Sequence, residues 1–216
     1  MPKFVPSVPS LKGISMHKYE IVVAGVGGQG VIFISNVLGY AAQRAGYRRV
    51  VGGEIHGLAQ RGGSVASYVR FGEGVYGPIV PLGCADIIIG LEFMEGLRHI
   101  NRLSKNGVLV LSNVRVPTMG MMVNNIAYPT SVDVLSKLQK LFDRVFLFES
   151  GNTRDHFRSL GLENMILLGA IVNNVLDFPI GEEDIKESIK TLIKKSMVER
   201  NLEAFQVGMK LRPLLT

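Results

Sequence analysis

Residues 19–45, YEIVVAGVGGQGVIFISNVLGYAAQRA, contain the pattern that decides the fold. The segment opens with a short β-branched run, Tyr19–Ala24, that stops at glycines. Val31–Ala45 then carries apolar residues at mixed helical spacing and ends before Gly46. An apolar run, a glycine turn and a periodic apolar segment predict a strand, a tight turn and a helix.

Further strands and helices alternate along the rest of the chain. Strands are predicted at Arg49–Val51, Ser64–Phe71, Ile87–Gly90, Val108–Leu111 and Arg144–Phe148, and helices at Glu92–Leu103, Ser131–Phe142 with Ser131 as the N-cap, Asn164–Leu176 and Glu182–Phe205. The runs at 87–90 and 108–111 are uninterrupted, which is typical of parallel strands covered on both faces. The alternation predicts an α/β fold: a single doubly wound, mostly parallel open sheet flanked by helices, of the Rossmann-like kind.

The composition indicates one domain with a large apolar surface. The 216 residues fit a single domain, since domains usually run to about 100–200 residues. Hydrophobic residues make up 47% of the chain and charged residues only 19%, against about 25% in typical domains. We therefore expect a partner to cover part of the apolar surface, and a homo-oligomer when the chain is alone.

The first 17 residues are expected to form a flexible tail ahead of a domain that spans residues 18–216. The opening stretch MPKFVPSVPSLKGISMHK has three prolines and no continuous apolar run, so it does not resemble a secretory signal. The apolar stretch Met165–Leu176 is interrupted by Asn173 and Asn174 and is shorter than the ~20 residues of a membrane span. The sequence predicts a cytoplasmic protein that does not enter a membrane.

The charged residues and the cysteine count limit the classes of site. The formal net charge of +6 suits an anionic ligand better than nucleic acid, because the basic residues are spread along the chain. Cys84 is the only cysteine, which excludes an internal disulfide, a zinc site of cysteines alone and an iron–sulfur cluster held by four thiolates of this chain. The four histidines are scattered, and we expect no metal. No serine lies in a nucleophile elbow, so no catalytic residue is predicted.

The first motif is the glycine loop Gly25–Gly30, GVGGQG. It satisfies G-x-G-x-x-G directly after a predicted strand and before a helix, where glycines let a phosphate approach the backbone. A dinucleotide site would also require an acidic residue about 20 positions further on, and Arg48–Val51 occupy that region. Three readings remain: a phosphate-bearing ligand, the backbone of a partner, or glycines that only close a tight turn.

The second motif is Gly52–Ser64, GGEIHGLAQRGGS, which mixes five glycines with Glu, His, Gln and Arg. In a doubly wound sheet this loop follows the second strand and falls at the same carboxyl edge as the first loop. Arg61 could bind a phosphate or carboxylate with two parallel hydrogen bonds, while Glu54 or His56 could orient a neighbouring group. A loop that shapes a subunit interface is the alternative interpretation.

Three segments together carry a resemblance to a known family. They are GVGGQG at 25–30, GGEIHGLAQRGGSVASYVRFG at 52–72 and ADIIIGLEFMEGLRHINRLSKNGVLVLSN at 85–113. They resemble the gamma-type domain of 2-oxoacid:ferredoxin oxidoreductases, and the indolepyruvate branch in particular. The resemblance runs from Tyr19 to Gly208 and includes NMILLGA at 164–170. The run Glu54–Gly63 is long and unusual, which makes it the specific part.

The resemblance implies a complex that decarboxylates an aryl pyruvate on thiamine diphosphate, reduces ferredoxin through iron–sulfur clusters and delivers the acyl group to coenzyme A. Thiamine diphosphate, its magnesium ion and the [4Fe-4S] clusters are expected on a large partner subunit, and coenzyme A at the rim loops of this chain. The resemblance implies that the binding residues of this chain are Gly27, Gly28, Gln29, Gly30, Glu54, His56, Gln60, Arg61, Gly62, Gly63 and Ser64. The proline-bearing tail has no counterpart in the family pattern.

Other functions stay open at this point. Within the family, the chain could be the gamma subunit of a pyruvate or 2-oxoglutarate ferredoxin oxidoreductase. A free-standing nucleotide or acyl-CoA binding module is the alternative from another class. An NAD-dependent enzyme is a third hypothesis, and the pair Arg48 and Arg49 argues against it because a ribose-binding acid belongs in that region.

Overall fold

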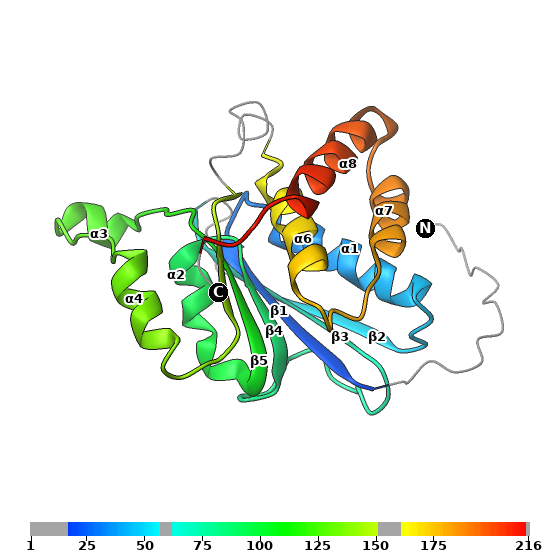
Figure 1. Cartoon of the computed structure of the whole chain (residues 1–216), viewed down its shortest axis with the longest axis horizontal. Helices are drawn as coiled ribbons and strands as arrows, with labels where there is room; N and C mark the ends of the chain where they lie inside the picture. Colours follow the sequence, from blue (N-terminus) through cyan, green and yellow to red (C-terminus); the bar gives the residue numbers. More distant parts are fainter. Residues whose placement is uncertain (1–16, 57–61, 151–160, 215–216) are drawn as a thin grey trace.

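The computed structural model describes residues 17–56, 62–150 and 161–214 and shows one six-stranded sheet between two helical layers (Figure 1). The strands are β1 (Tyr19–Val26), β2 (Val50–His56), β3 (Ser64–Phe71), β4 (Ala85–Gly90), β5 (Leu103–Ser112) and β6 (Val145–Phe148), in the spatial order β2-β3-β1-β4-β5-β6. The predicted N-terminal tail lies almost entirely outside the described residues.

The mostly parallel α/β sheet predicted from the sequence is confirmed, with one strand reversed. Strands β1, β4, β5 and β6 are parallel neighbours, whereas β3 pairs antiparallel with both β1 and β2. Among the described strands, only β3 therefore runs against the others. A hairpin replaces the helical crossover that parallel strands require, because only antiparallel neighbours can be joined by a short loop.

Helices cover both faces of the sheet (Figure 1). One layer holds α1 (Val31–Arg44), α6 (Glu163–Asn174), α7 (Glu182–Leu192) and α8 (Lys195–Met209), and the other holds α2 (Phe93–Arg98) and α4 (Ser131–Leu138), with the short α3 (Met119–Val123) and a 3-10 turn at Ile100–Arg102 beside it. Ile21 and Val23 of β1 enter the core under α1, while Val22 enters the core under α2. This alternation follows from the two-residue period of a strand.

Two glycines allow α6 and α8 to touch through their backbones. A Cβ atom at Gly169 would lie 2.1 Å from the carbonyl oxygen of Phe205, and one at Gly208 would lie 1.9 Å from that of Ile166. Any larger residue would push the helices apart. The pair explains why the predicted helix in NMILLGA carries a glycine in its middle.

Several predicted boundaries were wrong. The single helix predicted at 182–205 is two helices, because Ile193 and Lys194 adopt extended backbone and turn the chain so that α8 can pack on α6. The predicted helix at 92–103 ends at Arg98, and β5 begins at Leu103, five residues earlier than predicted. After Leu103 the early residues of β5 are Ser104, Lys105, Asn106 and Gly107, so hydrophobicity did not reveal them as part of a strand.

Helix α4 begins one residue later than its cap. The N-cap is Thr130, whose hydroxyl accepts a hydrogen bond of 3.3 Å from the backbone N–H of Asp133. The prediction of Ser131 as the N-cap was therefore wrong by one residue. Ser131 instead is buried at the first helical position and accepts a hydrogen bond from Arg115.

A buried ion pair joins β1 and β3 at the end of the sheet opposite the glycine loops. Glu20 faces Arg70 across the two strands, and the carboxylate of Glu20 accepts hydrogen bonds from the Arg70 guanidinium. Arg70 also donates to the carbonyl oxygens of Gly77 and Ile79, at 2.5 and 3.1 Å. The pair therefore anchors the connection between β3 and β4.

Candidate functional site

The two glycine-rich loops lie against each other at one edge of the sheet. Strand β1 ends at Val26 beside Ser64, where β3 begins. The N–H of Gly27 donates to the carbonyl oxygen of Gly63 at 2.8 Å, and the N–H of Gly62 donates to that of Gly27 at 3.3 Å. The structure thus brings the two predicted motifs together, although it does so through a hairpin and not through a second βα unit.

The glycine loop exposes bare backbone at its tip. Gly28 has φ +102° and Gly30 has φ +81°, values in the left-handed region that favours glycine. Apart from its chain neighbours, no atom of the described residues lies within 4 Å of the position that a Cβ of Gly28 would take, and the same holds for Gly62, with φ +71°, in the second loop. Two open glycines on adjacent loops give a ligand or a partner close access to the backbone.

The side chain of Gln29 fixes the glycine loop from within. Its carbonyl oxygen accepts a hydrogen bond of 2.8 Å from the N–H of Val26, and its amide nitrogen donates at 3.3 Å to the carbonyl oxygen of Leu91, which follows β4. A Cβ atom at Gly25 would lie 2.8 Å from that side-chain oxygen, so the turn has room only for glycine. The motif therefore holds β1 and β4 together at their carboxyl ends.

The crevice between β1 and β4, where a Rossmann-type sheet binds a dinucleotide, is filled. The chain leaves β1 toward the α1 layer and leaves β4 toward the α2 layer, which makes this the topological switch point. Gln29 and Asn164 occupy the space, and the amide nitrogen of Asn164 lies 2.2 Å from where a Cβ of Gly30 would be. Among the described residues, a cavity of about 10 Å³ lies beside these two side chains, which is the room for one water molecule. This geometry argues against the NAD-dependent reading.

Helix α2 holds the second loop through Glu95, which was not predicted to be part of the site. The hydroxyl of Ser64 donates a hydrogen bond of 2.5 Å to the buried carboxylate of Glu95, which also accepts at 3.0 Å from Arg98. Glu95 lies one helical turn from the Glu92 cap. The acidic pair at i and i+3 directly after a buried strand was the available signal, and it was interpreted only as the start of a helix.

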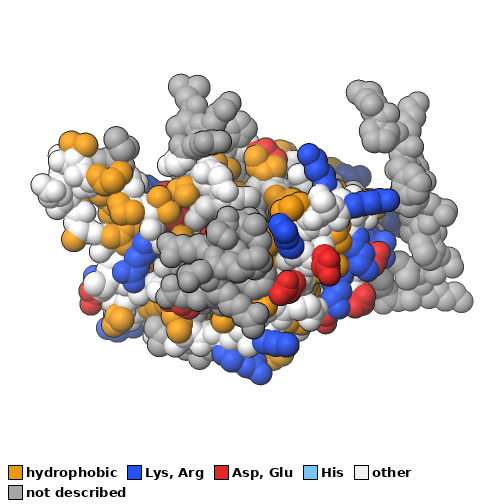
Figure 2. Space-filling view, turned by 90° about the horizontal axis from the view of Figure 1, so that it is seen from above, with side chains coloured by type: hydrophobic (Ala, Val, Ile, Leu, Met, Phe, Trp, Pro, Cys, Tyr) orange, Lys and Arg blue, Asp and Glu red, His pale blue; other side chains and the backbone are white. Residues whose placement is uncertain are grey.

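Glu92 holds both ends of the segment that carries α3. Its carboxylate caps α2, accepts a hydrogen bond of 3.0 Å from the N–H of Val116 and accepts another from the hydroxyl of Tyr128. Burial, together with the neighbouring Glu92 carboxylate, raises the pKa of the Tyr128 hydroxyl. Residues 116–130 contain no charged side chain. Seen from above, hydrophobic side chains gather over α3 and α4 (Figure 2).

The predicted binding residues divide into three groups. Gly27, Gly28, Gln29, Gly30, Gly62, Gly63 and Ser64 lie on the shared edge. Glu54, predicted in a loop, lies in strand β2 instead, because the glycines before it pair regularly with β3. The backbone of His56 pairs with Val65 at the end of β2, and its side chain is outside what the structure describes, as are Gln60 and Arg61.

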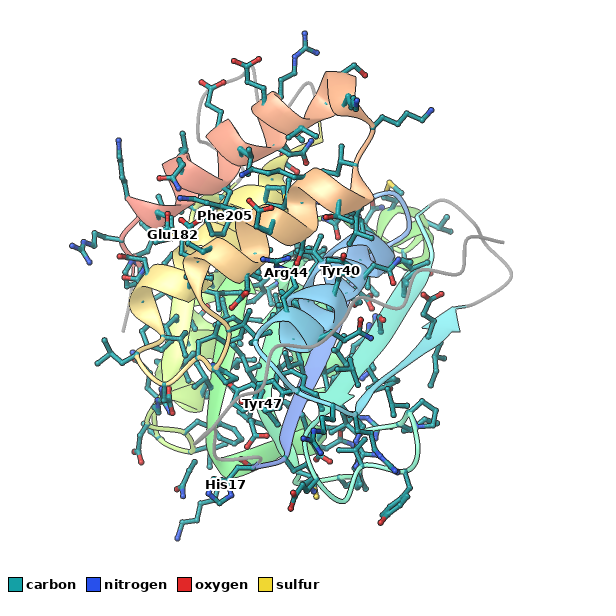
Figure 3. The ribbon with its side chains drawn as sticks, turned by 90° about the vertical axis from the view of Figure 1, so that its right-hand side faces the viewer. His17, Tyr40, Arg44, Tyr47, Glu182 and Phe205 are labelled. Carbon is teal, nitrogen blue, oxygen red and sulfur yellow. The ribbon has the colours of Figure 1, made fainter. Side chains whose placement is uncertain are left out.

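An open cleft of about 560 Å³ lies between α1 and strand β2, away from the shared edge. Asn36, Tyr40 and Gln43 of α1 line one wall, and β2 lines the other with Gly52 and Glu54. Figure 3 looks at this side of the molecule, with Tyr40 labelled on α1. Glu54 therefore belongs to this cleft in the structure.

The described residues contain neither a cluster of metal ligands nor a helix that could span a membrane. Within residues 17–56, 62–150 and 161–214, no three His, Cys, Asp or Glu side chains gather where they could hold a metal ion. In the same ranges no helix has the length and apolar character needed to cross a bilayer.

Comparison with known proteins assigns the chain to a family. The sequence profile of the family described as "Pyruvate ferredoxin/flavodoxin oxidoreductase" matches residues 20–211, which is nearly the whole chain. The chain belongs to this family. It is 41% identical over 197 residues to a protein of Thermococcus kodakarensis named "Indolepyruvate oxidoreductase subunit IorB", covering 90% of this chain and 96% of the relative.

Solved structures of the family share the fold. The gamma subunit of a keto/oxoacid ferredoxin oxidoreductase from Geobacter sulfurreducens matches with a TM-score of 0.62 and 23% identity, covering 89% of this chain and 96% of that one. A 2-oxoglutarate:ferredoxin oxidoreductase from Magnetococcus marinus, solved with 2-oxoglutarate, coenzyme A and succinyl-CoA bound, matches with a TM-score of 0.65 and 21% identity. That match covers 89% of this chain and 30% of the longer chain.

Proposed function

We propose that this chain is a subunit without redox centres in an indolepyruvate:ferredoxin oxidoreductase, an enzyme that oxidatively decarboxylates an aryl pyruvate to an acyl-CoA and reduces ferredoxin. One observation carries the proposal: 41% identity over almost the full length of both chains to a protein named as a subunit of an indolepyruvate oxidoreductase. A match of that length covers both glycine-rich loops, not only the scaffold.

The cysteine content of this chain determines which cofactors a partner subunit must hold. An iron–sulfur cluster of the four-thiolate kind requires four cysteines, and this chain has only Cys84. Its residues therefore do not fit the [4Fe-4S] clusters, which we assign with thiamine diphosphate and magnesium to a larger, cytoplasmic partner subunit that passes electrons to ferredoxin. The exposed Met122, Val123 and Val132 of the α3 and α4 surface support burial against such a partner.

The shared edge of the two loops suits contact with coenzyme A. Gly28 and Gly62 leave open space through which a ligand can approach the backbone, and backbone N–H groups of such loops bind phosphate oxygens. The N–H groups of Gly27 and Gly62 already join the two loops, so these two glycines offer close approach and not donors. We assign Gly27, Gly28, Gly30, Gly62, Gly63 and Arg61 to the ligand, and Gln29 and Ser64 to holding the loops in place. Coenzyme A, when bound, supplies the thiol that accepts the acyl group. His56 and Gln60 are proposed to contact the ligand or the partner.

Two alternatives compete with this proposal. A gamma subunit of a pyruvate or 2-oxoglutarate enzyme would share every structural feature described, since substrate choice belongs to the partner subunit. A free-standing nucleotide or acyl-CoA binding module is disfavoured for nucleotides that bind at a switch point, because Gln29 and Asn164 fill that crevice.

Co-expression tests the proposal. The tagged chain is expressed with the product of its neighbouring gene, and coenzyme A-dependent reduction of ferredoxin is measured with indolepyruvate, pyruvate and 2-oxoglutarate. We expect a brown complex that turns over indolepyruvate best, and an inactive, colourless chain when it is purified alone. Turnover by the isolated chain would contradict the proposal, and tight nucleotide binding without any partner would favour the binding module.

A further inference from the structure

The two outer strands of the sheet differ in how their free edges are covered. Beyond β6, the N–H of Leu214 donates a hydrogen bond of 2.7 Å to the carbonyl oxygen of Leu147, so the C-terminal segment lies along that edge. Beyond β2, no described strand pairs. Strand β2 is seven residues long, contains neither lysine nor proline and leaves Ile55 49% exposed, so Glu54 is the one acidic or basic charge that protects this edge strand.

Opposite charges stand at the two ends of this edge. Arg48, two residues before β2, and Glu54, near its end, are both exposed, and neither has an ion pair among the described residues. When two copies of such a strand pair antiparallel, the positive end of each meets the negative end of the other. A parallel arrangement would place like charges together.

One antiparallel register both pairs opposite charges and places a valine side chain opposite a glycine. If Val51 lies opposite Val51 of a second copy, Arg48 faces Glu54, and Val50 faces Gly52, each twice by symmetry. Gly52 has room for a facing side chain, since its nearest neighbour to an added Cβ is the carbonyl oxygen of Tyr68 at 3.7 Å. In this register Arg48 meets its counter-charge, Val50 meets a glycine and Val51 meets a second valine, and such cross-strand pairs stabilise a sheet.

The cleft beside the edge leaves space for the added strand. The opening of about 560 Å³ lies between α1 and β2, where side chains projecting toward α1 from a neighbouring strand would be placed. Its wall offers neutral polar side chains, Asn36 and Gln43, and the hydroxyl of Tyr40. Figure 3 shows the cyan strand β2 beside α1, on which Tyr40 is labelled.

We propose that β2 is a self-association interface, where the β2 strand of a second copy of this chain pairs antiparallel around Val51 and continues the sheet across both molecules. The inference names the surface behind the self-association expected of this chain. It concerns the isolated full-length chain and no turnover is measured, so its failure would leave the subunit assignment untouched.

Charge reversal tests the pairing. Sedimentation velocity of the full chain over a range of concentrations measures the dimer dissociation constant. We expect a dimer for the natural chain, at least about tenfold weaker association for Arg48→Glu and for Glu54→Arg, and restored association in the double variant. A monomeric natural chain overturns the proposal, and so does a dimer that neither single reversal weakens.

A disulfide tests the register. With Cys84 replaced by serine, Val51→Cys places two cysteines directly opposite each other, within the Cα separation that a disulfide accepts. Ile55→Cys is the matched control, because it lies on the same face of the same strand but opposite residue 47 in this register. We expect mild oxidation to give covalent dimers of the Val51 variant and not of the control. Equal cross-linking of both, or more of the control, overturns the register.

Discussion

The hydroxyl of Ser64 donates a 2.5 Å hydrogen bond to the buried carboxylate of Glu95, and this contact joins the second glycine-rich loop to helix α2. The loop is also tied to the glycine loop through the backbone of Gly27. Its position therefore depends on two neighbouring elements. Since the hydrogen bond to Glu95 is made by a side chain, it can be removed without altering the backbone.

Removing that hydroxyl should destabilise the protein. Ser64→Ala leaves the Glu95 carboxylate with Arg98 as its remaining hydrogen-bond partner among the described residues, and we expect a loss of about 1–2 kcal/mol in the free energy of unfolding. Urea denaturation measures it. Ser64→Thr keeps the hydroxyl and should lose less. Equal stability of the alanine variant and the natural chain would show that the contact contributes nothing.

The open glycine at the tip of the first loop should matter for ligand contact. Gly28→Ala introduces a side chain at φ +102° into open space, and we expect coenzyme A-dependent turnover of the complex to fall at least about tenfold. Gly74→Ala is the control, since Gly74 also has a positive φ and open surroundings but lies between β3 and β4. If both variants lose activity equally, strain and not ligand access is responsible.

The contact between α6 and α8 should tolerate no side chain. Gly208→Ala would place a methyl group 1.9 Å from the carbonyl oxygen of Ile166, and we expect a loss of about 3 kcal/mol or more, measured by thermal and urea unfolding. The same substitution at Gly39 of α1 meets only Val50 at 3.7 Å and should stabilise the helix by up to about 1 kcal/mol. If Gly208→Ala lowers the free energy of unfolding and Gly39→Ala raises it, the loss at Gly208 comes from crowding and not from helix propensity.

The buried pair of Glu20 and Arg70 should show the cost of an unpaired charge. Glu20→Met leaves Arg70 buried with only carbonyl partners, and we expect a loss of about 3–5 kcal/mol in unfolding free energy. Replacing both residues with methionine should recover much of that loss, because no charge then remains buried. A double variant less stable than the single one would contradict this account.

Stability should fall in mildly acidic solution because of His99. Burial, with a smaller effect of Arg102, lowers the pKa of His99 below its usual 6.5, so the folded state binds the proton less readily than the unfolded chain. The unfolded state therefore takes up more protons as the pH falls through 6.5, and folding stability decreases there. Unfolding measured from pH 7.5 to 5.5 should show this slope. His99→Gln should reduce it, and an unchanged slope would assign it to other groups.

Regular hydrophobic patterns predicted the sheet, but local polar contacts were not predictable. The runs at 87–90 and 108–111 gave β4 and β5 because a fully buried strand leaves an uninterrupted apolar run. The reversal of β3 was missed, since alternation in a strand is the same in either direction. That Glu54 lies in a strand was missed for a related reason: glycine has a low strand propensity, so Gly52 and Gly53 indicated a loop.

Only part of the site could be predicted from the sequence, and the reason is again physical. The glycine loop was found because positive φ values require glycine, which leaves a visible sequence mark. Glu95 and Glu92 left no comparable mark, because acidic residues in the first turn of a helix are common for reasons of helix dipole alone. Only the folded chain shows that their carboxylates reach Ser64, Val116 and Tyr128.

The hydrogen bond from Leu214 to Leu147 has a consequence for how the protein is made. Strand β6 receives its last neighbour from a residue that follows α8, far along the chain from β6 itself. During synthesis this edge stays uncovered until Leu214 has left the ribosome. A nascent chain or a truncated product thus presents β6 as an open template for aggregation, so a C-terminal fusion should be separated from Leu214 by a linker long enough to let that segment dock.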